Sequence, residues 1–534
     1  AEMIAISCEK GKSQVGGQIM MGGVRSIDVK VSISQFYGIE INDFAVTVAK
    51  TALWIAESQM LKETEAIVLM HLDFLPLKTN AYIVEGNALR MDWESIVPKN
   101  KLSYIMGNPP FIGARLMGDE QKKDVNAIFD GWKNAGNLDY VCCWYKKCAD
   151  YMKNTAVKSA LVSTNSVSQG ESVANLWKPL FEEGIHIDFA HRTFRWDSEA
   201  SSKAQVHCVI IGFNISPPPR IQKLRIYVGD RGREGDHINA YLLDGEDVFV
   251  VSRNKPLCEV PEIGMGNQPI DNGNYLFEKD EMEEFIRKEN SSEKYFHKWY
   301  GAKEFIEQKP RYCLWLGDCS PSELKKMPQC LVRVASVREY RLRSERMSTK
   351  KLADKPTHFQ TENMPKDNYI VIPEVSSQNR RYIPMGFFKP DVLCSNKLRL
   401  MPKASLYNFG VLQSNVHMAW TRVVCGRLKS DYDYSIKIVY NNFPWPTPTE
   451  AQKARIEQAA QAILDARALY PDSSLADLYD EITMPSELRR AHQQNDRAVM
   501  DAYGFVRGTE ARTSESACVA ELMKMYQKLV DKKK

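Results

Sequence analysis

The sequence predicts an α/β fold: a sheet covered by helices on both faces, followed by an α+β region and a helical C-terminal region. From 32 to 213, short β-branched runs alternate with longer amphipathic stretches, which is typical of strands and helices along an α/β sheet. From 220 to 448 the chain is richer in turns and aromatic residues. From 449 onward it is alanine-rich, which favours helices.

The individual elements follow from apolar runs and from the residues that interrupt them. Helices are expected at Phe44–Leu61 and Asp139–Lys153, and a further helix at Ala451–Tyr470. Pro217–Pro219 should end the first region, because consecutive prolines continue neither a strand ladder nor a helix. The expected strands are Gln35–Ile41, Ala81–Val84, Ser103–Met106, Ser159–Ser163, Ile185–Ala190, His207–Phe213, Tyr369–Ile372 and Ser435–Tyr440.

Length and composition narrow the class of protein. A chain of 534 residues is long enough for two or three domains. Its 44% hydrophobic and 26% charged residues are typical of a globular protein, and a net charge of +4 does not by itself indicate a nucleic-acid ligand. The 12 cysteines lack metal-ligand spacing, so we expect no metal site and a reducing, cytoplasmic environment. No run approaches the roughly 18 apolar residues of a membrane span, so we expect no membrane partner.

The most informative motif is the strand-like run Tyr104–Gly107 followed directly by Asn108-Pro109-Pro110-Phe111. Two prolines fix the backbone and remove two N–H donors, so local carbonyls stay free to accept hydrogen bonds. The side-chain oxygen of Asn108 and the carbonyl of Pro109 can then hold one amino group with its lone pair aimed at a methyl donor. Phe111 offers a face on which a planar base can stack. A proline-stiffened turn after a buried strand is the alternative interpretation.

Asn-Pro-Pro-Phe at the end of a strand resembles the fourth motif of amino-group methyltransferases that use S-adenosylmethionine. In that family an acidic residue after an earlier strand binds the ribose hydroxyls of the cofactor, and Glu40 and Ile41 match this position. Asn87 and Ala88, after the next strand, match the motif beside the cofactor adenine, where many relatives have aspartate. The resemblance implies a Rossmann-like class I methyltransferase domain with S-adenosylmethionine as its cofactor.

The segment from His191 to Trp196 resembles the eighth motif of the same family. There an aromatic side chain helps to hold a target base flipped out of the duplex; Phe194 is the first candidate and Trp196 the second. Methylation of a base nitrogen inside a duplex requires extrusion of that base, so two opposing aromatic faces suit the task. An ordinary core aromatic is the alternative for either residue.

More closely, the chain resembles the large single-chain restriction–modification enzymes of the MmeI type, of types IIG and IIL, from Phe36 to Pro446. Such enzymes fuse an N-terminal nuclease, a helical connector, a methyltransferase domain and a C-terminal target-recognition domain. The resemblance implies a methyltransferase domain at 1–219, a DNA target-recognition domain at 220–448 and a helical domain at 449–534. Outside the catalytic motifs it is carried by Tyr382–Pro384, Ser414–Trp420, Gly426–Ser430 and Tyr440–Pro446.

Two parts of that family have no match in this chain. The glycines Gly16, Gly17, Gly22 and Gly23 lack the spacing of the Asp-Pro-x-x-Gly-x-Gly loop that packs against the cofactor, and no segment reads as a nuclease. We interpret the methyltransferase domain as N-terminally truncated, by expression of a fragment, a split gene or a degenerate gene. An N-terminal nuclease region or separate subunit would then be a missing partner. We expect this chain alone to bind the cofactor weakly and to transfer methyl groups poorly.

Basic residues gather between 331 and 360 and are only partly balanced by acids. Within this run we expect Arg338, Arg341, Arg343 and Lys350 to contact phosphates of double-stranded DNA, which would make binding strongly salt-dependent. A solvated face is the alternative.

The stretch that contains Gln378, Asn379 and Arg380 is a candidate for reading bases. Gln and Asn can pair bidentately with adenine, and Arg with guanine, in the major groove. In the resembling family this segment varies with target specificity.

Together these patterns favour transfer of a methyl group to adenine N6 at a specific DNA site, with asparagine at position 108 favouring adenine by resemblance. An N-methyltransferase acting on RNA or on protein glutamine is the enzymatic alternative, because both reuse Asn-Pro-Pro-aromatic; the long second region argues against it. A non-catalytic DNA sequence-recognition module is the alternative from another class.

Overall fold

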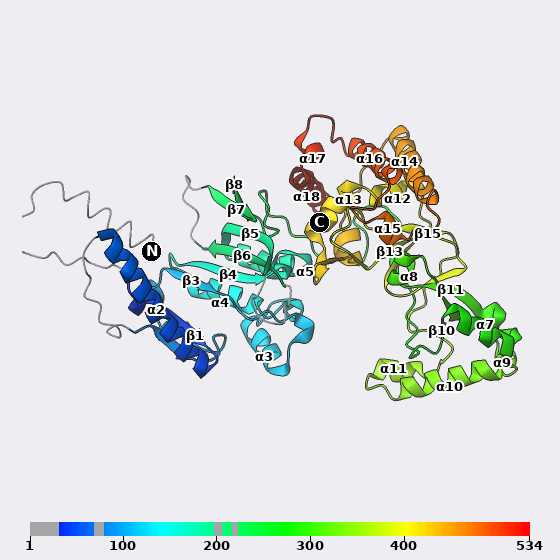
Figure 1. The fold of residues 1–534 in the computed structure, drawn as a ribbon, viewed down its shortest axis with the longest axis horizontal. Coiled ribbons are helices and arrows are strands. Elements are labelled where there is room, and N and C mark those ends of the chain that lie inside the picture. Colours follow the sequence, from blue (N-terminus) through cyan, green and yellow to red (C-terminus); the bar gives the residue numbers. More distant parts are fainter. Residues whose placement is uncertain (1–30, 69–79, 197–205, 216–222, 534) are drawn as a thin grey trace, which may run out of the picture. The chain divides into compact units, whose positions relative to one another are not determined.

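The computed structural model describes residues 31–68, 80–196, 206–215 and 223–533 (Figure 1). The four glycines expected near the cofactor loop and the three prolines at 217–219 lie outside these ranges. Within them, no helix is both long and apolar enough to cross a membrane.

Contacts divide the chain into two compact units, each of which draws on more than one stretch of sequence. The first contains Ala1–Ser163, Leu180–Asp188 and Ile210–Gln222. The second contains Thr164–Pro179, Phe189–Val209 and Lys223–Lys534.

In the first unit, strands β1 (Tyr37–Glu40) and β2 (Tyr82–Glu85), both expected from the sequence, form a two-stranded parallel sheet of their own rather than part of one common sheet. Tyr37 lies opposite Tyr82, and their rings stack with centroids 5.2 Å apart. Helix α2 (Asp43–Val68) connects the strands and packs against both. Because the strands are parallel, their carboxyl ends meet at one edge, where ligands bind in open α/β sheets.

A second, six-stranded sheet has the order β3-β4-β6-β5-β7-β8. Strand β3 pairs in parallel with β4, and β5 with β7, whereas β7 and β8 form an antiparallel hairpin. The sheet therefore continues beyond 217–219, which corrects the expectation that the prolines end it. The chain returns after β6 as β7, where Leu224 and Ile226 are buried. The bounds are β3 Tyr104–Gly107, β4 Lys158–Thr164, β5 His186–Trp196, β6 Val206–Asn214, β7 Leu224–Val228 and β8 Arg231–Gly235.

Helices accompany these strands, as the α/β pattern predicted. Helix α4 (Cys142–Met152) confirms the expected helix in this segment and buries most of its side chains, three cysteines among them. Cysteine behaves as a small apolar residue in such a core. The remaining helices are α3 (Asp119–Ile128), α5 (Gly170–Ser172), a π-helical turn (Val173–Trp177) and α6 (Lys178–Glu182).

The part of the second unit between 264 and 440 contains three small sheets. Strand β13 (Tyr369–Pro373) is buried along its whole length and confirms the expected strand there. The sheet orders are β10-β12-β11-β16, β15-β13-β17-β9 and β14-β19-β18. The other bounds are β9 Gly264–Met265, β10 Leu276–Phe277, β11 Phe296–Tyr300, β12 Arg311–Leu314, β14 Val375–Ser376, β15 Gly386–Phe388, β16 Val392–Cys394, β17 Leu398–Pro402, β18 Gly426–Leu428 and β19 Asp431–Asp433.

Helices pack around these sheets, and one helical turn lies where the sequence predicted a strand. Ser435–Tyr440 was expected as a strand, but Ile436–Tyr440 is a π-helical turn. Its β-branched side chains favour a strand, yet the side-chain amide of Asn442 donates to the carbonyls of Lys437 and Ile438 and holds the turn. The helices are α7 Lys279–Lys288, α8 Ala302–Glu307, α9 Pro321–Leu324, α10 Pro328–Leu342, α11 Met347–Leu352, α12 Leu406–Leu412 and α13 Asn415–Val424.

The C-terminal region is helical, as its composition predicted. Helix α14 (Glu450–Ala468) begins at a capping box formed by Thr449 and Gln452. It lies beside α16 (Ser486–Ala502) (Figure 1). Gly410 of α12 lies so close to α14 that an added Cβ would stand 2.6 Å from Ile456. The shorter α15 (Leu475–Leu478) and α17 (Glu510–Thr513) precede α16 and α18 (Glu515–Asp531), respectively.

Candidate functional site

Asn108 to Phe111 follow directly after β3, as the motif predicted. Asn108 is exposed, Pro109 is buried and Phe111 is half-buried. Among the described residues, the Asn108 side chain has no hydrogen-bond partner, so its oxygen is available to a ligand. Pro109 cannot donate and its buried ring fixes the backbone, which leaves a rigid pair of acceptors at the end of the strand.

The chain after Phe111 is held by the segment that leads into α4. The backbone N–H of Ala114 donates to the Asp139 carboxylate across 2.9 Å. The N–H of Tyr140 donates to the carbonyl of Ile112, also across 2.9 Å. These two bonds tie the loop to a buried helix, so Asn108 is positioned by the core rather than by a mobile turn.

The four residues matched to the cofactor motifs gather at one edge of the β1–β2 sheet. Glu40 ends β1 opposite Glu85, and Asn87 follows two residues later. One Glu40 carboxylate oxygen accepts the Ile41 N–H across 2.9 Å, while the Ile41 side chain is 70% exposed. Ala88 contributes its carbonyl to the Trp93 indole N–H. A half-buried carboxylate beside an exposed apolar side chain suits a ribose next to a planar base.

The carboxylate of Asp124, on α3, accepts hydrogen bonds from Asn87 and from two residues near it. It accepts from the Asn87 amide at 3.1 Å, from Arg90 Nε at 2.7 Å and from the Tyr140 hydroxyl at 2.7 Å. Burial alone would raise the pKa of Asp124, but the hydrogen bonds from Arg90, Tyr140 and Asn87 outweigh it and lower the pKa. Asp124 therefore stays ionised and fixes the orientation of Asn87.

Sequence reasoning missed Asp124, because the run from Asp119 to Asp124 reads as a solvated, charged helix. The one available signal was its position: Asp124 and Val125 are the buried pair on an otherwise polar helix. In the sequence, however, an acidic residue next to a valine gives no sign of a contact with Asn87, which lies 37 positions earlier.

Phe194 and Trp196 both lie on β5. Their ring centroids are 6.3 Å apart with the planes tilted by 44°. Phe194 is half-buried and Trp196 is 41% exposed. Part of each residue is therefore accessible to solvent.

Three of the four basic candidates for phosphate contact are exposed. Arg338 lies on α10, Arg343 follows its end and pairs with Glu339, and Lys350 lies on α11. Arg341 is different: it is 0% exposed, and its guanidinium donates to the backbone carbonyls of Pro269, Ile270, Leu352, Lys355 and His358. The prediction that Arg341 contacts DNA is therefore wrong; its donors are committed to holding residues 269–270 and 352–358 against α10.

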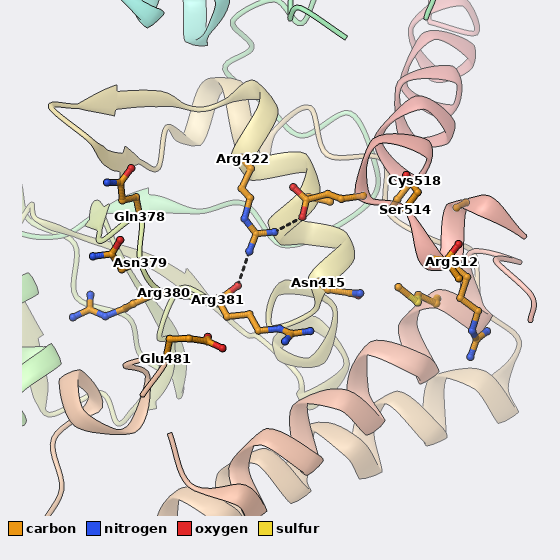
Figure 2. A pocket seen from close by; sticks show the side chains of 15 residues that line it. Gln378, Asn379, Arg380, Arg381, Asn415, Arg422, Glu481, Arg512, Ser514 and Cys518 are labelled. Atoms are coloured by element: carbon orange, nitrogen blue, oxygen red, sulfur yellow. Dashed lines mark hydrogen bonds and ion pairs between the residues drawn. The ribbon is translucent and has the colours of Figure 1, made fainter. Parts of the chain in front are cut away.

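The expected base-reading residues lie between β14 and the buried Tyr382. Gln378 and Asn379 are exposed and Arg380 is half-buried. With residues of α13 and of the C-terminal helices they line a cavity of about 550 Å³ (Figure 2). Burial lowers the pKa of Arg380, with Asp431 and Asp480 opposing that effect. No three His, Cys, Asp or Glu side chains of the described residues gather as a metal site.

Comparison with known proteins gives consistent matches along the chain. Family models of MmeI match as its DNA-methyltransferase domain at 8–227, its target recognition domain at 244–447 and its C-terminal domain at 448–533. DNA methyltransferase A of Bacillus subtilis (strain 168) is 39% identical over 505 residues, which are 94% of this chain and 57% of that protein. The chain thus spans little more than half the length of this curated relative.

A solved structure is similar over nearly the whole chain. It is the type IIL restriction–modification enzyme MmeI in complex with DNA, with a TM-score of 0.87 and 41% sequence identity. The similarity covers 99% of this chain and 71% of that one.

Proposed function

The chain belongs to the MmeI family, and from this we propose that it methylates adenine N6 at a specific site in double-stranded DNA, as part of a restriction–modification enzyme. The observation that carries the proposal is Asn108: an exposed amide without a side-chain partner among the described residues, at the end of β3 and directly before two prolines.

The chemistry follows from what these groups can accept. The target amino group would donate one N–H to the Asn108 side-chain oxygen and the other to the Pro109 carbonyl. Its nitrogen lone pair then points away from both acceptors. As the N–C bond forms, positive charge develops on the amino nitrogen, and two fixed oxygen dipoles stabilise that charge. S-adenosylmethionine, when bound, supplies the electrophilic methyl group.

The residues at the β1–β2 edge fit that cofactor. The Glu40 carboxylate can accept both ribose hydroxyls, because only one of its oxygens is used by the Ile41 N–H among the described residues. The exposed Ile41 side chain can cover one face of the adenine, and Asn87 and Ala88 can lie at its edge. Asp124 positions Asn87 without touching the cofactor.

The second unit would supply DNA recognition. Phe194, with Trp196 near it, would stack on the extruded base. Gln378, Asn379 and Arg380 would read base edges, and exposed Arg338, Arg343 and Lys350 would contact phosphates. The name of the Bacillus relative and the DNA bound to the solved MmeI structure support this assignment.

The test is nucleoside mass spectrometry on DNA from cells that express the whole reading frame that contains this chain. We expect N6-methyladenine with the wild type and its loss with Asn108→Ala. Asn100→Ala is the matched control, because Asn100 is an exposed asparagine of the same unit with no side-chain partner among the described residues. N4-methylcytosine would correct the base. The absence of any modified base would favour a DNA-reading module without catalysis.

A further inference from the structure

The reading segment, Ser377–Arg381, is anchored through its backbone, while the side chains of Gln378, Asn379 and Arg380 stay free. At its start the N–H of Gln378 donates to the Asp431 carboxylate across 3.2 Å. Within it the N–H of Arg380 donates to the carbonyl of Ser377 across 3.2 Å. The side chains of Gln378, Asn379 and Arg380 make no hydrogen bond to other described residues. Where these side chains lie therefore depends on what holds the backbone.

At its other end the reading segment is held by the C-terminal region through Arg422 of α13. One guanidinium nitrogen of Arg422 donates to the carbonyl of Arg381 across 3.0 Å, and another pairs with the Glu515 carboxylate across 2.8 Å (Figure 2). Glu515 is the first residue of α18. Its carboxylate fixes Arg422 in the rotamer that reaches Arg381, because a planar guanidinium donates along fixed directions.

A second contact joins the two regions directly beneath the reading segment. Asp496 of α16 accepts from the Tyr382 hydroxyl at 2.6 Å and from the N–H of Asn415 at 2.8 Å. Tyr382 also stacks on His492 of α16, with ring centroids 4.1 Å apart. Asp496 is only 6% exposed, so both bonds form away from competing water.

The Arg422–Glu515 ion pair borders a cavity rather than a packed interface, because both side chains line it. The cavity of about 550 Å³ is lined on one side by the reading segment and on the other by α17 and α18, including Arg512 and Ser514 (Figure 2). In a packed interface, neighbours would buffer the loss of one ion pair. Because Arg422 and Glu515 line this cavity, few other side chains pack around them to hold the Arg381 backbone when their ion pair is lost.

We propose that Glu515 and Asp496 are positioning residues for DNA reading, so that the C-terminal helical region sets the sequence specificity of the reading segment. Glu515 acts through Arg422, and Asp496 acts through Tyr382 and Asn415. This inference rests on the proposed function, in which Gln378, Asn379 and Arg380 contact bases.

Glu515→Gln distinguishes two explanations, because they predict opposite changes in affinity for the cognate sequence. Removing an acid close to bound DNA raises affinity for every sequence if its charge merely repels phosphates. If Glu515 instead positions Arg422, the variant loses affinity for the cognate sequence and gains or keeps affinity for others. The Glu515 side chain is 52% exposed, so its replacement should not unfold the protein.

The experiment begins with selection of a preferred duplex from a random library by the whole chain. Dissociation constants are then measured for this duplex and a scrambled one at a single salt concentration. We expect Glu515→Gln to lower the ratio of cognate to scrambled affinity about tenfold. Glu510→Gln, an exposed acid of α17 with no side-chain partner among the described residues, should leave the ratio unchanged.

A double-mutant cycle tests whether Glu515 acts through Arg422. In the Arg422→Gln background, Glu515→Gln should have no further effect on the ratio. Asp496→Asn replaces one accepting carboxylate oxygen by an amide NH2 group, which would face an existing donor. The variant should also lower the ratio of cognate to scrambled affinity. Circular dichroism checks that it folds. An unchanged ratio, or equal tightening on both duplexes, with Glu515→Gln overturns the proposal.

The proposed function fails in a different way. If no duplex is enriched, or if Gln378→Ala and Arg380→Ala leave the affinity ratio unchanged, then the reading segment does not read bases. If those two variants lower the ratio while Glu515→Gln does not, base reading stands and the positioning role is excluded.

Discussion

The side-chain nitrogen of Asn87 lies 3.1 Å from a carboxylate oxygen of Asp124, and this contact fixes which way the amide points. The Asn87 oxygen is committed as well, because it accepts the N–H of Leu89 across 2.9 Å. Both ends of the amide are thus satisfied within the protein. Of the two flip orientations of its side-chain amide, Asn87 therefore offers only one to the proposed cofactor adenine.

Loss of the Asp124 charge should weaken cofactor binding. Asp124→Asn replaces an acceptor of three hydrogen bonds by a group that must donate at one oxygen position, and charged hydrogen bonds contribute roughly 1.5–3 kcal/mol each. We expect at least a tenfold loss of S-adenosylmethionine affinity by titration calorimetry. Glu120→Gln, which also bonds Arg90 but is exposed, is the control and should bind normally. Equal affinities of the two variants would contradict the role of Asp124.

The sequence was enough to predict local structure where the residues that determine it are neighbours in the chain. Asn108-Pro109-Pro110-Phe111 fixes its own backbone, and the strands before it follow from short β-branched runs. The parallel pairing of β1 and β2, which brings Glu40 and Asn87 to one edge, also follows from the alternation of strands and helices.

The sequence was not enough to predict a residue's structure or role where these depend on a side chain or carbonyl from elsewhere in the chain. Ser435–Tyr440 has strand-like composition, and the Asn442 side chain makes it a turn. Arg341 belongs to a basic run, but five backbone carbonyls use its donors, and two of them belong to Pro269 and Ile270, about 70 residues earlier. Glu515 lies 93 residues after its partner Arg422, and no periodicity in the sequence links them.

Arg341→Met should destabilise the second unit. The substitution leaves five backbone carbonyls without their donor, and a carbonyl left unsatisfied inside the protein costs roughly 1–3 kcal/mol. We expect a clear drop in melting temperature by calorimetry. Arg343→Ala, two residues later and exposed, should change stability by no more than about 0.5 kcal/mol. Equal melting temperatures for Arg341→Met and the wild type would refute the structural role.

The exposed basic residues predict a different readout, the salt dependence of DNA binding. Arg338→Ala should weaken binding to all duplexes alike and reduce the slope of log affinity against log salt by about 1, because one phosphate contact is lost. Lys350→Ala should behave in the same way. Arg455→Ala, an exposed arginine of α14 without a side-chain partner among the described residues, controls for the change in net charge. A slope that changes equally in all three variants would argue against a defined phosphate surface.

Asp496 predicts a pH dependence of stability. Burial raises the pKa of Asp496 to about 6, although hydrogen bonds from Tyr382 and Asn415 lower it. The unfolded chain releases this proton near pH 3.9. Between these values the folded state binds more protons than the unfolded state, so unfolding free energy falls as pH rises. The contribution of Asp496 is largest below about pH 4 and is lost as pH rises through about 6.

Asp496→Asn isolates this contribution because asparagine does not titrate. The stability of the wild type relative to Asp496→Asn should fall by on the order of 3 kcal/mol between pH 4 and pH 7 and stay flat above that range. Thermal melts of both proteins across this range measure the difference. Asp472→Asn, an exposed acid without a side-chain partner among the described residues, should give a curve parallel to the wild type. A difference that grows with pH would mean that Asp496 is ionised at low pH, with its two hydrogen bonds outweighing the cost of burial.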